Sequence, residues 1–171
     1  MTQPFEIPLT DQDLFGDEQH REATESYIAI RLNSEWYGVP LSRVREIIRV
    51  GQIAFLPSVP ASIAGITNLR GSLLSVTDLK LLCGISPNAA DEQRRIVIVE
   101  SEAVQTGLLV DEVLEVVEIP ISRLELPLAT LAPERKSFIT HVYRWNGRLM
   151  ALLDIGQILK GGMGDGTQHV H

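Results

Sequence analysis

The sequence predicts an all-β fold in which two small barrels, or closed sheets, pack together with a few short helices. Short apolar runs separated by turn-forming residues recur along most of the chain, and this pattern is typical of strands joined by tight turns. The pattern of the first half returns in the second half, so each half is expected to supply a similar closed sheet. The chain of 171 residues is 44% hydrophobic and 22% charged, which is typical of a folded globular protein.

The first half is expected to open with a pair of strands and a short helix. The strands are Tyr27–Leu32 and Trp36–Val39, with a turn over residues 33–35 between them. Apolar residues then recur at helical spacing over residues 41–48, directly behind Pro40. This spacing predicts a short amphipathic helix.

A strand and a capped helix are expected to complete the first half. The strand is Ser72–Thr77, entered through the turn-forming segment Asn68–Gly71. Asp78 follows the strand, where its carboxylate can cap a short helix over Leu79–Cys83. Gly84 is expected to end that helix in a left-handed conformation.

The second half is expected to hold mostly strands, after a polar surface linker over Ser86–Gln93. Asn146-Gly147 between two apolar strands is a strong signal for a type I′ hairpin turn. A last short helix is expected to begin near Asp154, followed by a flexible glycine-rich segment over Gly161–Gly166. The predicted strands are Arg95–Glu100, Gln105–Val110, Val113–Ile119, Phe138–Trp145 and Arg148–Leu153.

Matched residues in the two halves stand at constant offsets, which indicates an internal duplication. One set is 69 residues apart and another is 76 residues apart. Each half is therefore expected to hold the same unit, and the two halves could exchange a strand. The matched pairs are Gly38 and Gly107, Val44 and Val113, Glu46 and Glu115, Gly71 and Gly147, and Asp78 and Asp154. The residues assigned to turns and caps are Asn68, Gly71, Asp78, Gly84, Gly107, Asn146, Gly147 and Asp154.

Charge and glycine content divide the chain into three expected parts. Residues 1–25 carry seven acids and one base, a net charge of −6 out of −7 for the whole chain. They are expected to form a disordered acidic arm whose few apolar residues either stay solvated or dock on a partner. Residues 26–160 are expected to form the folded body, whose net charge is close to zero. Residues 161–171 are expected to form a flexible tail. A neutral body offers no broad cationic surface, so nucleic acid is not expected as a partner.

The protein is expected to be cytoplasmic and not to insert into a membrane. Its apolar runs are too short to cross a bilayer, and residues 1–10 lack the basic and continuous apolar regions of a secretory signal. The single cysteine, Cys83, cannot form an internal disulfide, as expected in a reducing compartment.

No set of residues supports catalysis, a metal or a cofactor. His169 and His171 lie close together, but no cysteine or carboxylate cluster accompanies them. His141 has no serine or cysteine at a recognisable nucleophile spacing. Two alternatives from other classes stay open from the residues alone: a small β-barrel hydrolase that uses His141 and Asp154, and a free-standing ligand-binding barrel.

Turn geometry explains Asn68 and Gly71 but does not explain Arg70. Asn68 and Gly71 supply turn geometry, as Asn146 and Gly147 do in the second half. A turn does not require an arginine. A guanidinium at a turn tip is placed to make two bonds with a carboxylate of another protein, and a merely solvated arginine is the alternative.

The segment from Pro60 to Leu79 resembles the signature of the chemotaxis coupling protein (CheW) family, which contains the same Asn68-Leu69-Arg70-Gly71 motif and a strand that ends in Asp-Leu. Further matches follow in order from about Tyr27 to Lys160. They are Trp36-Tyr37-Gly38-Val39, Val44-Arg45-Glu46-Ile47, Gly107-Leu108-Leu109-Val110-Asp111-Glu112-Val113 and Leu152-Leu153-Asp154-Ile155.

The resemblance implies two SH3-like, five-stranded β-barrels and a non-enzymatic adaptor. Its partners would be the cytoplasmic tip of a methyl-accepting chemoreceptor and the regulatory domain of a CheA-type histidine kinase, in receptor arrays at the inner face of the membrane. A type IV pilus or phototaxis pathway is the alternative to flagellar chemotaxis. By position, the receptor groove would include Val44, Arg70 and Ile96, and the kinase-binding or partner-facing residues would include Glu46, Ile47 and Gly65.

The chain departs from the family pattern at one functional segment. Many members that form rings with the kinase carry an acidic–aromatic pair after the proline of the second barrel. Here the segment is Leu126-Pro127-Leu128-Ala129-Thr130, so formation of the second ring contact is an open question. The acidic arm is also not a general feature of the family.

Overall fold

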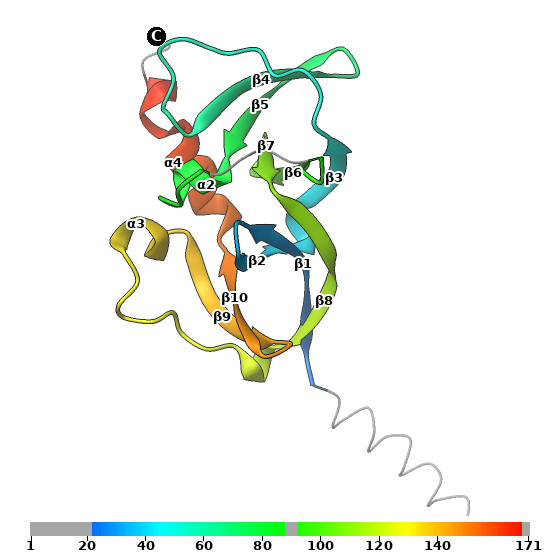
Figure 1. Ribbon diagram of the computed structural model, residues 1–171, viewed down its shortest axis with the longest axis vertical. Coiled ribbons are helices and arrows are strands. Elements are labelled where there is room, and N and C mark those ends of the chain that lie inside the picture. The colour runs from blue at the N-terminus through cyan, green and yellow to red at the C-terminus, as the bar shows by residue number, and fades with distance from the viewer. Residues whose placement is uncertain (1–21, 88–91, 169–171) are drawn as a thin grey trace, which may run out of the picture.

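The computed structural model describes residues 22–87 and 92–168, with side chains as far as Gly161, and contains ten strands in two five-stranded sheets (Figure 1). Every strand that the sequence predicted is present, with its ends shifted by at most three residues, as is the predicted Asn146-Gly147 hairpin. The strands are β1 (Thr24–Leu32), β2 (Glu35–Pro40), β3 (Val44–Arg49), β4 (Ile63–Leu69), β5 (Ser72–Asp78), β6 (Arg95–Ser101), β7 (Val104–Val110), β8 (Glu112–Pro120), β9 (Ile139–Trp145) and β10 (Arg148–Leu153).

The two halves of the chain exchange strands, a possibility that the sequence left open. The first sheet has the order β8-β1-β2-β10-β9 and the second has the order β3-β6-β7-β5-β4. The first sheet therefore joins β1 and β2 of the first half to β8, β9 and β10 of the second half, and the second sheet joins β6 and β7 to β3, β4 and β5. The chain passes from one sheet to the other between β2 and β3 and between β7 and β8 (Figure 1). Both sheets contain one parallel pair at the same place, β2 with β10 and β5 with β7.

Each sheet is closed into a barrel by one short bridge. Ala54, which follows β3, exchanges both backbone hydrogen bonds with Ile66 of β4 at 2.7 and 2.9 Å. Glu125, which follows β8, does the same with Val142 of β9 at 2.9 and 2.8 Å. The internal duplication therefore extends to the closure, and the fold is the pair of five-stranded barrels that the resemblance implied.

Helices are short and lie at the ends of strands. Asp78 caps α2, accepting a hydrogen bond from the backbone N–H of Leu81, and Asp154 accepts the equivalent bond from Gln157 at the start of α4. Gly84 has a φ of 72°, as predicted for the residue that ends α2. The helices are η2 (Leu41–Arg43), α2 (Leu79–Leu82), η3 (Ile121–Arg123), α3 (Pro133–Lys136) and α4 (Ile155–Gln168).

Three sequence predictions are wrong, one on the type of an element and two on where elements begin or end. Residues 41–48 form one turn of 3-10 helix and then β3, in which half-buried and exposed residues alternate, because β-branched valine and isoleucine suit a half-buried strand. The backbone of α4 continues through Gly161–Gly166, which were expected to be a flexible tail. The body begins before residue 25, since β1 starts at Thr24 and Ala23 accepts a hydrogen bond from Ile121.

Several predicted features lie outside the described residues. They are most of the acidic arm, the central part of the linker and the histidines at the carboxyl end. Their ranges are residues 1–21, 88–91 and 169–171.

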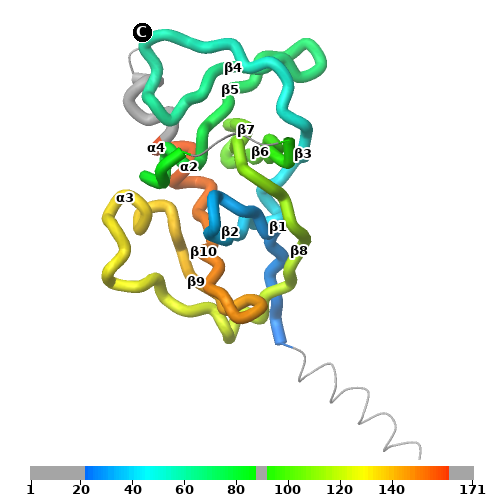
Figure 2. Tube along the Cα trace, viewed as in Figure 1, coloured from blue at the N-terminus to red at the C-terminus, as the bar shows by residue number. Residues whose placement is uncertain are grey.

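The core consists of three apolar clusters. One fills each barrel, and the largest lies between them, where residues of β1 and β2 pack against β6, β7, α2 and α4. Figure 2 shows α4 running from the end of β10 along the other barrel. Cys83 belongs to the central cluster and is 1% exposed, and its burial raises the pKa of the thiol to about 12. The two barrels therefore share an apolar interface and form one unit.

Gly38 and Gly107 occupy equivalent positions inside β2 and β7. Gly107 was grouped with the turn residues, and that assignment is wrong. A Cβ atom at Gly107 would lie 2.4 Å from Cγ2 of Ile96, and one at Gly38 would lie 2.7 Å from Cδ2 of Leu152. Glycine is needed there because the neighbouring strand packs directly against the backbone.

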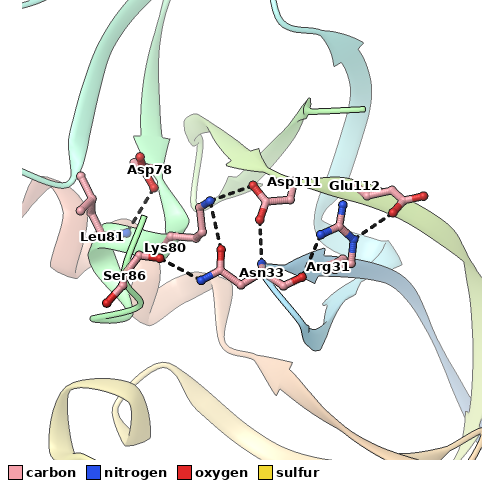
Figure 3. A network of polar contacts seen from close by, with 8 residues as sticks. All are labelled: Arg31, Asn33, Asp78, Lys80, Leu81, Ser86, Asp111 and Glu112. Carbon is pink, nitrogen blue, oxygen red and sulfur yellow. Dashed lines mark hydrogen bonds and ion pairs between the residues drawn. The ribbon is translucent and has the colours of Figure 1, made fainter. Parts of the chain in front are cut away.

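A buried polar network joins the barrels at the point where the chain crosses from β7 to β8 (Figure 3). Nζ of Lys80 lies 3.0 Å from Oδ1 of Asp111, and both residues are less than 10% exposed. The backbone N–H of Asn33, in the β1–β2 turn, donates to the other carboxylate oxygen at 2.7 Å. The side-chain amide of Asn33 in turn donates to the carbonyl of Ser86 at 2.8 Å. The network thus ties α2 of one barrel to a turn of the other.

Candidate functional site

The β4–β5 hairpin presents Arg70 at its tip. Arg70 and Gly71 are the two central turn residues, with φ values of 50° and 88°, and they correspond to Asn146 and Gly147 at 49° and 79°. Positive φ at both positions is what a type I′ turn requires. The turn geometry was expected to come from Asn68 and Gly71. Asn68 instead supports the turn from outside, accepting a hydrogen bond from the backbone N–H of Gly71 at 2.8 Å.

Arg70 is paired with Glu46 of β3, on the opposite edge of the same sheet. Its two terminal nitrogens donate to the two carboxylate oxygens at 2.9 and 2.6 Å. The hydrogen bonds from Arg70 lower the pKa of the Glu46 carboxyl, and the same bonds raise the pKa of the guanidinium. The Arg70 side chain is 69% exposed, so the pair holds the guanidinium in one place while one side remains open to solvent.

Ile47 follows Glu46 in β3 and is exposed on the other face of that strand. Along β3, Arg45, Ile47 and Arg49 are exposed and alternate with the half-buried residues Val44, Glu46 and Ile48. Ile47 is 39% exposed, and Arg45 makes two hydrogen bonds with Glu100 of the neighbouring strand. The exposed face of β3 therefore combines an isoleucine with the guanidinium of Arg45, which Glu100 holds in place.

A shallow hollow of about 400 Å³ lies at the same end of the barrel. Its lining includes Ile53, Ile66 and Leu73. Leu73 is 72% exposed and Phe55 is 79% exposed. Neither exposed residue was predicted from the sequence. The adjacent Leu73 and Leu74 carried a signal, because neighbouring residues of a strand face opposite sides and only one of them could be buried.

Three of the residues assigned by resemblance offer little or no surface. Ile96 is fully buried and pairs with Ile48 inside the barrel. Val44 is half-buried and packs on the central apolar cluster. Gly65 is buried with a φ of 152°, and a Cβ atom there would lie 2.2 Å from the carbonyl oxygen of Ala54. These residues shape the surface, whereas Arg70, Glu46 and Ile47 form it.

The residues of the hydrolase alternative do not form a catalytic arrangement. Asp154 accepts a hydrogen bond from the backbone N–H of Gln157 and so serves as a helix cap. His141 is half-buried within β9 and pairs with Leu152. Among the described residues, no group of three histidine, cysteine or acidic side chains could hold a metal ion.

The described helices are all too short or too polar to cross a membrane.

Comparison with known proteins gives consistent matches. A family model described as the CheW-like domain matches residues 26–162. Protein PilI of Pseudomonas aeruginosa is 30% identical over 125 residues, which cover 72% of this chain and 70% of that protein. The chemotaxis protein CheW of Bacillus subtilis is 24% identical over 135 residues, which cover 79% of this chain and 86% of that protein.

A solved structure also matches the fold. It is the crystal structure of the scaffolding protein TtCheW from Thermoanaerobacter tengcongensis, with a TM-score of 0.71 and 29% sequence identity. The match covers 80% of this chain and 88% of that chain.

Proposed function

Because this chain belongs to the CheW-like domain family, whose members are adaptors rather than enzymes, we propose that it couples the cytoplasmic tips of chemoreceptors to a CheA-type histidine kinase. The family as a whole couples chemoreceptors and CheA, and the hydrolase alternative is excluded by this membership. The adaptor would act by raising the local concentration of its two partners. It would be recruited to receptor arrays at the inner face of the membrane.

The surface around Arg70 supports the assignment of a receptor-binding site. Its guanidinium is fixed by Glu46 and is still largely exposed. The hollow beside Leu73 adds apolar area at the same end of the barrel, and Ile47 is exposed on the other face of β3. An oriented arginine can make two parallel hydrogen bonds with a carboxylate of a partner, and exposed aliphatic side chains nearby can be buried in the same interface.

A direct test uses the full chain with two purified partners from the same genome, a receptor-tip helical hairpin and the regulatory domain of the kinase. Calorimetry is expected to show binding to each partner, and saturation with the receptor fragment should leave kinase binding intact. Absence of binding to either partner at concentrations of tens of micromolar would contradict the adaptor assignment. Mutually exclusive binding would contradict the proposed coupling through two faces.

A pilus pathway is the second candidate, because Protein PilI shares 30% identity with this chain. Recovery from native lysate with the tagged full chain separates the pathways, since the kinase and receptor that are recovered can be identified by mass spectrometry. A kinase encoded with pilus genes would favour this candidate, and one encoded with flagellar genes would contradict it.

Replacing Ile47 with aspartate should weaken receptor binding by about ten-fold or more, because a charge would replace an apolar contact in the interface. The circular dichroism spectrum should not change, since the side chain already faces solvent. Val104→Asp is a matched control on β7, because Val104 has the same exposed fraction of 39%, and it should bind normally. Val44→Asp should instead lower the melting temperature, because Val44 packs on the core. Normal receptor binding by Ile47→Asp would remove Ile47 from the site.

A further inference from the structure

We propose that residues 1–21 of this chain dock on one face of its own first barrel. This surface, the η3–β10 face, lies at the end of the barrel where β1 begins and includes the β9–β10 hairpin (Figure 1). It is formed by η3, the segment that follows it and the hairpin. Its exposed residues are Arg123, Leu126, Leu128, Arg144, Arg148 and Leu149.

The chain enters the body beside this face. The carboxylate of Glu22 accepts a hydrogen bond from the hydroxyl of Ser122 at 2.5 Å, and the carbonyl of Ala23 accepts one from the backbone N–H of Ile121 at 3.0 Å. Both contacts are with η3. A hollow of about 340 Å³ lies beside them, and its lining includes Arg123 and the ion pair of Arg144 with Glu125. Residues 1–21 are therefore tethered at the edge of the surface that they would cover.

Charge favours this docking. Residues 1–21 hold five acids and one base, a net charge of −4. The η3–β10 face holds three bases, Arg123, Arg144 and Arg148, and one acid, Glu125, which pairs with Arg144 at 3.2 Å, a net charge of +2. Opposite charges on a tethered segment and on the adjacent surface attract each other, and salt screens the attraction.

The η3–β10 face also exposes apolar area that residues 1–21 can cover. Leu126 is 79% exposed and Leu128 is 54% exposed. The acidic segment carries Leu14 and Phe15 seven to eight residues before Glu22. An extended stretch of that length spans up to roughly 25 Å, so these side chains can reach any part of the face of a barrel this small.

Tethering makes even weak docking effective. A segment joined to its target by a short flexible connection has an effective concentration on the order of millimolar. An affinity that would be negligible between separate molecules can therefore keep the face covered. A partner that used the η3–β10 face would have to displace the acidic segment.

The two tryptophans of the chain report on this face. The rings of Trp36 and Trp145 contact each other at a tilt of 58° with centroids 4.8 Å apart, and the guanidinium of Arg148 lies 4.2 Å from the Trp36 ring centroid. The test compares acrylamide quenching of tryptophan fluorescence in the full chain and in a variant that lacks residues 1–21. The deletion should increase the quenching constant, and high salt should have the same effect on the full chain. A synthetic peptide of residues 1–21, but not a scrambled peptide, should reverse the effect in the deleted variant.

Paired variants locate the contact. Arg123→Glu with Leu126→Asp in the full chain should reproduce the effect of the deletion. Arg43→Glu is the matched control, because Arg43 ends Pro40-Leu41-Ser42-Arg43 just as Arg123 ends Pro120-Ile121-Ser122-Arg123, and both close a 3-10 turn. It should leave quenching unchanged. All these measurements use this chain alone, so they do not depend on the proposed adaptor function.

Two outcomes would overturn the proposal. Equal quenching in the full and deleted chains, with no peptide binding at millimolar concentration, would show that the segment does not touch the face. Concentration-dependent dimerisation of the full chain that disappears on deletion, measured by sedimentation equilibrium, would show that the segment docks on a second copy.

Discussion

Replacing Arg70 with glutamate should abolish receptor coupling and preserve the fold. Truncating one partner of a charge pair that is desolvated in an interface lowers affinity by about thirty-fold or more, and charge reversal should cost more because it brings carboxylates together. In this chain the new carboxylate would also face Glu46, which now accepts both hydrogen bonds from the arginine. The measurement is calorimetric titration of the variant with the receptor-tip fragment, together with a thermal melt.

Further variants separate the guanidinium itself from its effect on the turn. Arg70→Asn removes the charge and places at φ 50° the residue type that occupies the equivalent position, Asn146, at 49°. It should therefore fold at least as well as the natural chain and still lose most of its receptor affinity. The double variant Arg70→Glu with Glu46→Arg restores the pair within the chain but reverses its two ends.

The double variant decides between two roles for the pair. If a carboxylate of the receptor binds the guanidinium at the hairpin tip, the double variant should bind the receptor as poorly as Arg70→Glu alone. Recovery of receptor binding would mean that the pair acts only by holding the hairpin against β3. Undiminished affinity of Arg70→Glu itself would leave Arg70 as an ordinary solvated arginine.

Replacing Lys80 with methionine should cause a larger loss of stability than breaking any of the exposed ion pairs of the barrels. Removing one partner of a buried ion pair costs about 3–5 kcal/mol, because the other charge is left buried. Asp111 keeps a hydrogen bond from Asn33 and slight solvent exposure, so about 2–4 kcal/mol is the expected loss in the free energy of unfolding. For a chain of this size that corresponds to a decrease of roughly 5–15 °C in melting temperature.

Matched variants test whether the loss comes from the orphaned charge. Lys80→Met with Asp111→Asn removes both charges and keeps an acceptor for the Asn33 N–H, so it should recover most of the lost stability. Arg45→Met breaks an ion pair of similar length, 3.1 Å, whose arginine side chain is 55% exposed, and it should change the melting temperature little. A small effect of Lys80→Met, or no recovery in the double variant, would show that the network does not stabilise the joined barrels.

Local sequence signals determined much of this protein. The type I′ turn at Asn146-Gly147 and the caps at Asp78 and Asp154 were predicted correctly, because each depends on a few neighbouring residues. The internal duplication also held, down to the equivalent parallel pairs. The ordered motifs indicated the family, which the matching family model confirms.

Residues 41–48 mark the limit of local signals. A short apolar run can satisfy the spacing of a helix and the alternation of a strand at once. Pairing with β6 decided for the strand, since the backbone groups of β3 find their partners in a strand that begins 46 residues after β3 ends. The same choice left Ile47 exposed and turned Val44 toward the core.

Only the tertiary structure decided how the site and the joint between the barrels are assembled. Closure of the second barrel brings the edge strand β3 beside the β4–β5 hairpin at the other edge, and so creates the pair of Glu46 with Arg70. The parallel pairing of β5 with β7, two strands from different halves of the chain, brings Lys80 to Asp111 at the point where the chain crosses from β7 to β8. Sequence motifs specify turns, caps and alternation, which are local properties of the backbone. Contacts between residues distant in the chain depend on which sheet each strand joins, because that choice is set by the burial of the whole apolar core.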